Sequence, residues 1–282
     1  MRIAIATCLT IPEVDVDEAI TVAAFQSRGH DVTMVPWDDP EQDVSRFDAV
    51  IIRSTWNYPD HVKAFADWIA DTATKTTLLN PADILLGNLN KRYLIELEAR
   101  GIPVVPSQWI WTHDAENLAT LLVGKSVVKP TVGAGSMDTR VFEPHEIDEA
   151  IAWLRSQGPD REFMVQPYMS SVDTVGEQSI IMIGGEPSHR IHKHPRFADG
   201  HENVEGPFEV SSEYADLAMR ILAPIQDRIL YARVDMMMND EGKWVLSELE
   251  LIEPSLFFRQ KPEALDKLVD RAETLLGCGA KE

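Results

Sequence analysis

The sequence predicts an α/β protein with more than one subdomain, and three observations support this class. In the first 80 residues, short β-rich runs alternate with segments whose apolar residues recur at helical spacing. Further along the chain, strands come in pairs joined by tight turns, as in antiparallel hairpins. A chain of 282 residues is also long enough to form two or three subdomains with their own cores.

The N-terminal segment predicts a parallel sheet of the Rossmann-like type. Strands are expected at 2–7, 30–37 and 47–56, and helices at 16–29 and 61–72. Strands that alternate with helices are typical of parallel sheets, because a parallel connection must cross over the sheet. No GxGxxG fingerprint follows the first strand, so a dinucleotide site of that kind is not expected.

The rest of the chain mixes helices with antiparallel strands. Helices are expected at 88–101, 144–158, 212–229 and 262–277, and a strand at 161–169. Hairpins are expected at 125–143, at 178–195 with its turn at Gly184 and Gly185, and at 230–254 with its turn at 239–242. The polar, glycine-containing segment 196–206 predicts a loop over a binding site, and a simple exposed loop remains the alternative.

Composition excludes several classes of partner. The chain has 26 Lys and Arg against 46 Asp and Glu, a formal net charge of −20, which repels nucleic acid and anionic membranes. No apolar run reaches the roughly 18 residues that a membrane-spanning helix needs. Cys8 and Cys278 form neither a disulfide framework nor a metal motif. We therefore expect a cytoplasmic protein without nucleic-acid or membrane partners, in which any anionic ligand needs a local basic pocket.

Carboxylates interrupt the last predicted hairpin. In VLSELELIEPSLFF (245–258), Glu248 and Glu250 share one face of a strand, since alternate residues point the same way. Arg233 and Asp235 share a face of the partner strand. Asp235, Glu248 and Glu250 together suit Mg²⁺, which prefers hard oxygen ligands. On spacing alone, a solvated sheet face explains them equally well.

Two further segments carry positive charge. Lys129 precedes a turn of small residues, Gly133 to Ser136, whose backbone N–H groups could approach a phosphate, although GxxxxGK[ST] is absent and a flexible hairpin loop is the simpler interpretation. SHRIHKHP (188–195) favours a strand whose cations face a phosphate. A zinc site there is least favoured, because no cysteine or matched carboxylate pattern supports it, and a basic surface strand remains open.

Polar and aromatic residues leave the third predicted strand in IIRSTWNYPD (51–60). Ligands of open α/β sheets bind beyond the carboxyl ends of strands. Arg53 and Ser54 stand at that end, where Arg53 could hold a carboxylate through two hydrogen bonds and Trp56 and Tyr58 could line the pocket. An ordinary loop with Trp56 packed inside remains the alternative.

Taken in order, these segments resemble the ATP-grasp superfamily. The resemblance runs from about residue 85 to 260 through NKRYLIELEARGIPVVP, VVKP, FMVQPYM, VGEQS, SHRIHKHP, YARVDMM and LSELELIEPSLFF. GEQS, SHRIHKHP and ELELIEPSL are most similar to the glutathione-synthetase-like branch, which includes a cyclo-ligase that makes cycloserine from an O-ureido-serine. The implied domains are an N-terminal substrate domain (1–85), a linking helix and strand (86–112), and two α+β subdomains that enclose ATP (113–169 and 170–282).

The resemblance implies an ATP- and Mg²⁺-dependent carbon–nitrogen ligase that forms ADP. A small-molecule carboxylate, of an amino acid or peptide-like acid, would be activated as an acyl phosphate and attacked by a nitrogen nucleophile, which in a cyclo-ligase belongs to the same molecule. A small-molecule kinase and a non-catalytic nucleotide-binding module are the alternatives. Subunits commonly pair in this superfamily, so a homodimer is also expected.

The resemblance also assigns roles by position. The residues implied for the nucleotide are Lys91, Lys129, Gly133, Gly135, Ser136 and Lys193 at the phosphates, Gln166, Pro167, Tyr168 and Met169 at adenine, and Glu177 at the ribose. Arg233 would stabilise the charge that develops during the reaction, assisted by Lys193. Asp235, Glu248 and Glu250 would hold one or two Mg²⁺, although many relatives have an amide in place of Glu250. Glu253 and Ser255 would face the substrate, with a helix-cap or salt-bridge role for Glu253 remaining open.

Overall fold

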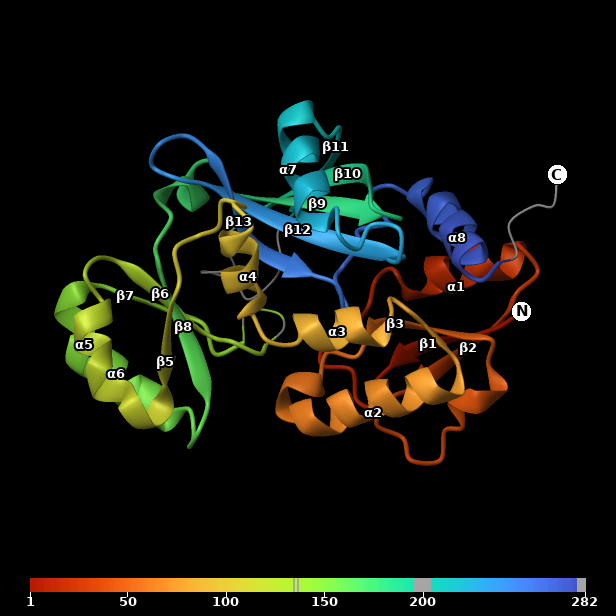
Figure 1. Ribbon diagram of the computed structural model, residues 1–282, viewed down its shortest axis with the longest axis horizontal. Coiled ribbons are helices and arrows are strands. Elements are labelled where there is room, and N and C mark those ends of the chain that lie inside the picture. The colour runs from red at the N-terminus through yellow and green to blue at the C-terminus, as the bar shows by residue number, and fades with distance from the viewer. Residues whose placement is uncertain (134, 136, 195–203, 278–282) are drawn as a thin grey trace. The chain divides into compact units, whose positions relative to one another are not determined.

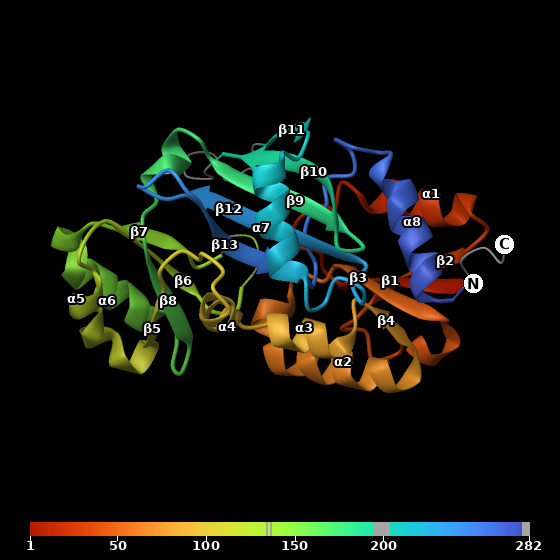
Figure 2. The ribbon, with the colours of Figure 1, turned by 45° about the horizontal axis from the view of Figure 1, so that its top comes forward.

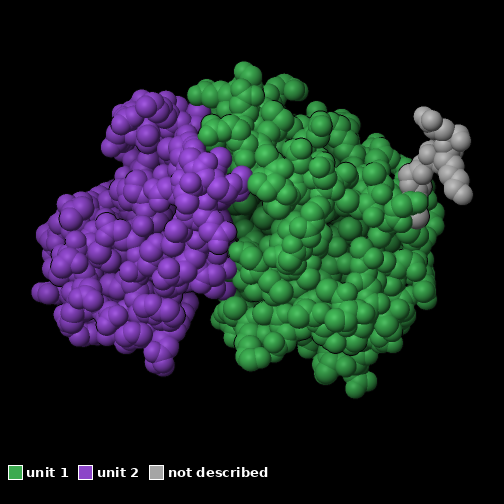
Figure 3. Space-filling model, viewed as in Figure 1, with its two compact units in different colours: residues 1–89, 176–236, 248–282 green, residues 90–175, 237–247 purple. Residues whose placement is uncertain are grey.

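The structure is a computed structural model that describes residues 1–133, 135, 137–194 and 204–277. The chain forms two compact units, each assembled from segments that are not contiguous in the sequence (Figure 3). Unit 1 holds residues 1–89, 176–236 and 248–282, and unit 2 holds residues 90–175 and 237–247. Each unit therefore carries its own share of the predicted site residues.

The first sheet of unit 1 is parallel throughout, as the alternation of strands and helices predicts. Its order is β2 (Asp31–Pro36), β1 (Arg2–Thr7), β3 (Ala49–Ser54) and β4 (Thr77–Leu79). Helices α1 (Glu18–Ser27) and α2 (Val62–Lys75) lie on opposite sides of this sheet, and α3 (Ala82–Asn88) packs beside α2 (Figure 1). Burial on both faces explains why β3 is apolar along most of its length.

The second sheet of unit 1 contains both predicted C-terminal hairpins. Its order is β11 (Val204–Phe208), β10 (Glu186–Lys193), β9 (Glu177–Ile183), β12 (Tyr231–Met238) and β13 (Trp244–Glu250), and the far end of the β12–β13 hairpin is grouped with unit 2. The pairs β11–β10, β10–β9 and β9–β12 are antiparallel. Gly184 and Gly185 turn the β9–β10 hairpin with φ of 59° and 80°, which favours glycine at both positions.

Alternation along the strands gives the second sheet two faces, which we call the front and the back. Residues that point to the front include Glu177, Ser179, Lys193, Arg233 and Asp235, and those that point to the back include Gln178, Arg190 and His192. Helix α7 (Ser212–Leu222) packs across β9 and β10 (Figure 2). The ring of Tyr214 on α7 lies 5.1 Å from the Arg190 guanidinium carbon, so α7 covers the back face.

One hydrophobic core joins the elements of unit 1. It includes Ile3 of β1, Phe25 of α1, Ile181 of β9, Tyr231 of β12 and Leu268 of α8 (Ala264–Leu275). Burial of each such side chain contributes about 1.5–3 kcal/mol to stability. Helix α8 packs against α1, far from it in sequence (Figure 1). The front face of the second sheet thus rests on the core that it shares with the first sheet.

Unit 2 is built around an antiparallel sheet. Its order is β5 (Gln108–Trp111), β8 (Glu162–Pro167), β6 (Ser126–Pro130) and β7 (Arg140–Phe142). Helices α5 (Leu118–Leu121) and α6 (Ile147–Ser156) bury Leu118, Ala150 and Leu154 against it. Helix α4 (Tyr93–Ala99) also belongs to unit 2. Short 3₁₀ turns occur in both units, at Val44–Arg46, Tyr58–Asp60, Thr112–Asn117, Pro144–Glu146 and Ser170–Asp173.

Three predicted segments differ from the structure. The predicted helix 88–101 is divided between α3 and α4, because the Asn90 side chain accepts the Arg92 amide at 2.9 Å and forms a turn. The predicted helix 212–229 ends at Leu222, shortly before Pro224, which lacks the N–H that a helix interior needs. None of the helices in the described part of the chain is long and apolar enough to cross a membrane.

The third difference concerns the segment 196–206, for which the sequence predicts a loop. Its last residues, 204–206, belong to strand β11, and residues 196–203 lie outside the described residues. Strand β11 pairs only with β10 and is the edge strand of its sheet as described. Edge strands tolerate the polar residues and glycine that made this segment resemble a loop.

Candidate active site

Charged side chains meet on the front face of the second sheet. The Arg233 guanidinium donates to Asp235, with Nε 3.0 Å from Oδ1 and Nη2 2.9 Å from Oδ2, and it also contacts Glu250. Lys193 Nζ lies 3.1 Å from Asp235 Oδ2 and 2.5 Å from Glu177 Oε1. We call these five residues, Glu177, Lys193, Arg233, Asp235 and Glu250, the front-face cluster. The structure therefore brings together residues that were predicted separately for ribose, phosphate, catalysis and metal.

Asp235 is the ionised centre of the front-face cluster. Its side chain is almost completely buried, and burial by itself raises the pKa of a carboxyl group. The charges of Arg233 and Lys193 and a 2.6 Å hydrogen bond from the Ser179 hydroxyl outweigh burial and hold the pKa of Asp235 below its usual range. Asp235 is therefore a carboxylate at neutral pH, held between two cations.

The outer carboxyl groups of the cluster titrate differently. Burial raises the pKa of Glu250 to about 7 against the effect of Arg233, and the negative charges of Asp235 and Glu248 add to the rise. Burial likewise raises the pKa of Glu177, although Lys193 opposes it. The cluster thus contains more carboxylate than its two cations neutralise, which favours the uptake of a further proton or cation.

The donor chemistry of this region fits Mg²⁺. Asp235 and Glu250 supply carboxylate oxygens, and Glu248 lies on the same face of β13 as Glu250 by strand alternation. The Arg233 guanidinium bridges Asp235 and Glu250, where it neutralises the same charges that a metal would neutralise. Asp235, Glu248 and Glu250 therefore remain the predicted Mg²⁺ ligands, and the number of ions that they would hold also stays a prediction.

The end of β3 meets the segment that follows β13, also within unit 1. Arg53 is only 2% exposed, and its Nη1 donates to the Pro254 carbonyl oxygen at 2.9 Å. The Trp56 indole nitrogen donates to the Glu253 carbonyl oxygen at 3.1 Å. Arg53 Nε is buried and has no hydrogen-bond partner among the described residues. An unpaired buried donor is costly, so Arg53 keeps one unsatisfied hydrogen-bond donor at this end of the sheet.

The other residues predicted for the substrate have more local contacts. Ser54 Oγ donates to Thr7 Oγ1 at 2.9 Å and links β3 to β1, while the Ser255 carbonyl oxygen accepts from Arg233 Nη1 at 3.4 Å. Tyr58 is buried beside the Glu253 side chain. Burial first, and then the charge of Glu253, raises the pKa of Tyr58 well above its usual value. The Tyr58 hydroxyl is therefore a neutral hydrogen-bond donor at this end of the sheet.

Sequence reasoning missed the residues that position this substrate-side segment. Asn80 is fully buried, and its Nδ2 donates to the Tyr231 and Leu251 carbonyl oxygens at 3.0 and 2.7 Å. Asp17 accepts the backbone N–H groups of Phe258 and Arg259 at 2.9 and 3.0 Å. A polar residue directly after an apolar strand, as in LLNP (78–81), is the signal that could have identified Asn80.

Unit 2 contains the lysine and the glycine turn predicted for phosphate. Lys91 Nζ donates to the Gly133 carbonyl oxygen at 3.0 Å, and the Lys91 amide donates to the Thr131 carbonyl oxygen at 2.8 Å. A side chain at Gly133 would lie 3.1 Å from Pro130 Cγ, so the backbone is close-packed there. Lys129 lies on β6 opposite Met164 of β8. Ala134 and Ser136 lie outside the described residues.

The segment predicted for adenine, residues 166–169, is held by hydrogen bonds and apolar packing within unit 2. The Gln166 side chain donates to Ser107 Oγ at 2.9 Å, and Pro167 ends β8. The Tyr168 hydroxyl donates to Asp173 at 2.6 Å, and burial together with that contact raises the pKa of Tyr168 to about 12. Met169 packs in a small apolar cluster with Val105 and Val245. The role of this segment in binding adenine stays a prediction.

Comparisons with known proteins agree with this architecture. A family model described as the N-terminal domain of D-cycloserine synthetase DcsG matches residues 3–80. The cycloserine biosynthesis protein DcsG of Streptomyces lavendulae is 27% identical over 272 residues, which cover 86% of this chain and 88% of that protein. The crystal structure of D-cycloserine synthetase DcsG matches with a TM-score of 0.86 at 25% identity, covering 98% of this chain and 100% of that one.

More distant solved structures share the fold. A RimK-domain ATP-grasp protein from Sphaerobacter thermophilus matches with a TM-score of 0.70 at 16% identity, covering 99% of both chains. The D-alanine–D-alanine ligase of Bacillus anthracis matches with a TM-score of 0.69 at 13% identity, covering 98% of this chain and 97% of that one. The predicted ATP-grasp fold is thereby confirmed.

Proposed function

We propose that this chain is an ATP-grasp carbon–nitrogen ligase that forms ADP. In the proposed reaction, it activates the carboxylate of an amino acid or peptide-like acid for attack by a nitrogen nucleophile. The observation that supports this proposal most directly is the front-face cluster, in which Arg233 and Lys193 share the carboxylate of Asp235. Phosphoryl transfer needs charge neutralisation and positioning above all, and this cluster supplies both.

In the first step, an oxygen of the substrate carboxylate attacks the γ-phosphorus of ATP. The bond between that phosphorus and the β–γ bridging oxygen breaks, so that ADP leaves and an acyl phosphate remains. Lys193 would neutralise the transferred group, with Lys91 and Lys129 at the other phosphates. Mg²⁺ held by Asp235, Glu248 and Glu250 would supply further neutralising charge when bound. No protein base is needed, because the attacking carboxylate is already ionised.

In the second step, the nitrogen nucleophile attacks the acyl carbon. The C–N bond forms, the bond from that carbon to the phosphate oxygen breaks, and the nitrogen loses one proton as inorganic phosphate leaves. Arg233 would stabilise the oxyanion that forms on the way. The likeness to D-cycloserine synthetase over nearly the full chain supports a nitrogen in the same molecule, so that the product is a ring.

The substrate would bind at the end of β3. Arg53 retains a buried Nε donor, and the Trp56 indole and the Glu253 backbone fix the wall beside it. The guanidinium group suits an anionic or carbonyl oxygen of the substrate. Tyr58 and Glu253 would then contact its polar groups, and Ser54 and Ser255 would act through the backbone and strand contacts that they make.

ADP release from a panel of amino acids and ureido or aminooxy acids tests this proposal. We expect one of these carboxylates to stimulate ADP formation with Mg²⁺, hydroxylamine to trap its acyl group as a hydroxamate, and ¹⁸O from its carboxylate to appear in phosphate. A stable phosphorylated product without a new C–N bond would favour a kinase instead. ATP binding without ADP formation from any acid would favour a non-catalytic module. The homodimer expected from the resemblance is tested by sedimentation at several protein concentrations.

A further inference from the structure

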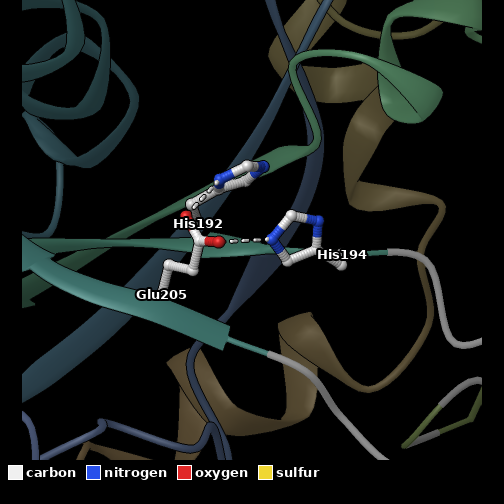
Figure 4. Close-up of side chains that lie close together, drawn as sticks. All are labelled: His192, His194 and Glu205. Carbon is white, nitrogen blue, oxygen red and sulfur yellow. Dashed lines mark ion pairs between the residues drawn. The ribbon is translucent and has the colours of Figure 1, made fainter.

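Three side chains with metal-binding atoms meet on the back face of the second sheet. They are His192 of β10, His194 just beyond it and Glu205 of β11, and one nitrogen or oxygen atom from each lies within 4.8 Å of the other two. His192 Nδ1 is 3.6 Å from Glu205 Oε2, and His194 Nε2 is 3.2 Å from Glu205 Oε1. Figure 4 shows the two imidazole rings close together and the carboxylate of Glu205 beside them, with one ring at each carboxylate oxygen.

Strand geometry explains why these three residues converge. His192 and His194 are two positions apart, so they point to the same side of the chain. Glu205 lies directly opposite His192 in the β10–β11 register and therefore faces the same side. Little in the sequence alone supports a zinc site, because no carboxylate pattern matches the histidines. Strand β11, in a segment predicted as a loop, supplies that carboxylate.

The separations of both histidines from Glu205 are close to those in a metal-ligand set. Zn²⁺ binds imidazole nitrogen and carboxylate oxygen at about 2.0–2.2 Å, so tetrahedral ligands lie about 3.3 Å from one another. The two measured separations, 3.6 and 3.2 Å, lie on either side of that value.

The surroundings hold the His192 ring in a ligating position. A side chain at Gly176 would lie 2.0 Å from His192 Nε2, so only glycine leaves room for the ring. Nε2 is buried without a hydrogen-bond partner in the described part of the chain, which leaves Nδ1 as the nitrogen directed at Glu205.

We propose that His192, His194 and Glu205 bind one divalent transition-metal ion of the Zn²⁺ class. Two imidazoles and one carboxylate select such an ion over Mg²⁺, which prefers oxygen ligands alone. The site is separate from the front-face cluster, because Lys193, between the two histidines, points to the opposite face and contacts Asp235. Three protein ligands leave a fourth position for water. The bound ion would cross-link the edge strand β11 to β10.

Binding of Co²⁺ and Zn²⁺ to tag-free, chelator-treated protein tests this proposal. The titrations are run with saturating Mg²⁺, and Co²⁺ is followed by its visible absorption and Zn²⁺ by calorimetry. We expect one ion per chain, a visible Co²⁺ spectrum with nitrogen ligands, and a higher unfolding temperature with Zn²⁺. His194→Asn and Glu205→Gln should each weaken binding at least about tenfold, since even residues behind the ligands change affinity by that much.

Matched variants separate this site from other metal-binding groups. His113 also lies beside carboxylates, at 3.1 Å from Asp160 and 3.6 Å from Asp114, but has no second imidazole. His113→Asn and Asp235→Asn should therefore keep the Co²⁺ spectrum. Both ligand side chains chosen for substitution are at least partly exposed, and circular dichroism checks that the variants fold. Equal binding by wild type, His194→Asn and Glu205→Gln would overturn the proposal, as would the absence of binding by wild type.

Discussion

Arg233 and Asp235, two residues apart on one strand, are joined by a two-point ion pair on the front face of the sheet. Arg233 Nε and Nη2 lie 3.0 and 2.9 Å from the two carboxylate oxygens of Asp235. Arg233, which is proposed to stabilise the charge that develops during the reaction, thus also neutralises Asp235, which is proposed to bind Mg²⁺. Metal binding and the position of Arg233 are therefore coupled through Asp235, and the first two predictions test this coupling.

Replacement of Arg233 should affect stability and catalysis together. Arg233→Met leaves Asp235 buried without one of its cations, so we expect the free energy of unfolding to fall by about 3–5 kcal/mol in the absence of Mg²⁺. Mg²⁺ should restore part of that loss, and kcat should fall about 100-fold or more. The control is Arg228→Met, whose ion pair with Asp83 is half-exposed and should contribute little to stability. Similar losses in both variants would contradict the prediction.

Removal of a proposed metal carboxylate should change the use of Mg²⁺ more than folding. For Glu248→Gln, we expect the Mg²⁺ concentration that gives half-maximal ADP formation to rise at least about tenfold, because one hard oxygen ligand loses its charge. Glu241→Gln, a change at an exposed glutamate, serves as the control. An unchanged Mg²⁺ dependence in Glu248→Gln would instead support a solvated sheet face.

Arg53 should determine the affinity for the acid rather than for ATP. A charged hydrogen bond is worth about 1.5–3 kcal/mol, so Arg53→Lys should raise the KM of the carboxylate substrate about tenfold to hundredfold and leave the KM of ATP nearly constant. Lysine keeps the charge but loses the Nε donor and the planar geometry. Measuring both KM values in one series checks the assignment, which a rise in the KM of ATP alone would refute.

His189 should make stability fall in mild acid. Burial lowers the pKa of His189 to about 4, while its ring bonds the Leu256 carbonyl oxygen at 3.1 Å. The unfolded chain has the ordinary histidine pKa of about 6.5 and binds the proton first as pH falls. Stability contributed by this residue is therefore fully present above about pH 7 and is lost toward pH 4, by about 3 kcal/mol in total.

Denaturant unfolding at a series of pH values measures this effect. His189→Gln should flatten the curve between pH 4 and 6.5, whereas His61→Gln, at an exposed position, should leave it as in wild type. An unchanged slope in His189→Gln would show that other groups cause the acid sensitivity.

Much of the fold could be predicted from local patterns. The β9–β10 hairpin was placed correctly by its two glycines, and the parallel order of the first sheet followed from the strand–helix alternation. The break between α3 and α4 could not be predicted from apolar spacing, because it depends on one hydrogen bond of Asn90. Strand β11 could not be predicted in the same way, because its strand conformation depends on pairing with β10 and its own residues do not indicate a strand.

The candidate site was predictable in part. The shared face of Arg233 and Asp235 followed from their spacing, but their direct pairing required the actual side-chain geometry. The support that Asn80 gives to residues 231 and 251 spans more than 150 positions of sequence, a distance over which no single-sequence pattern carries information. For the same reason, Glu205 could not be matched with His192 before the register of β10 and β11 was known.

Strand β10 carries two different chemistries on alternate residues, and this restricts the insertions and deletions that the strand can accept. A single-residue deletion between His189 and His192 would turn Lys193 away from Asp235 and present an imidazole there instead. The extra residue already accommodated between Pro187 and His189 marks where the pairing can absorb such a change. Length variation in natural or engineered descendants of this chain should therefore be confined to that bulge and to the glycine turn beside it.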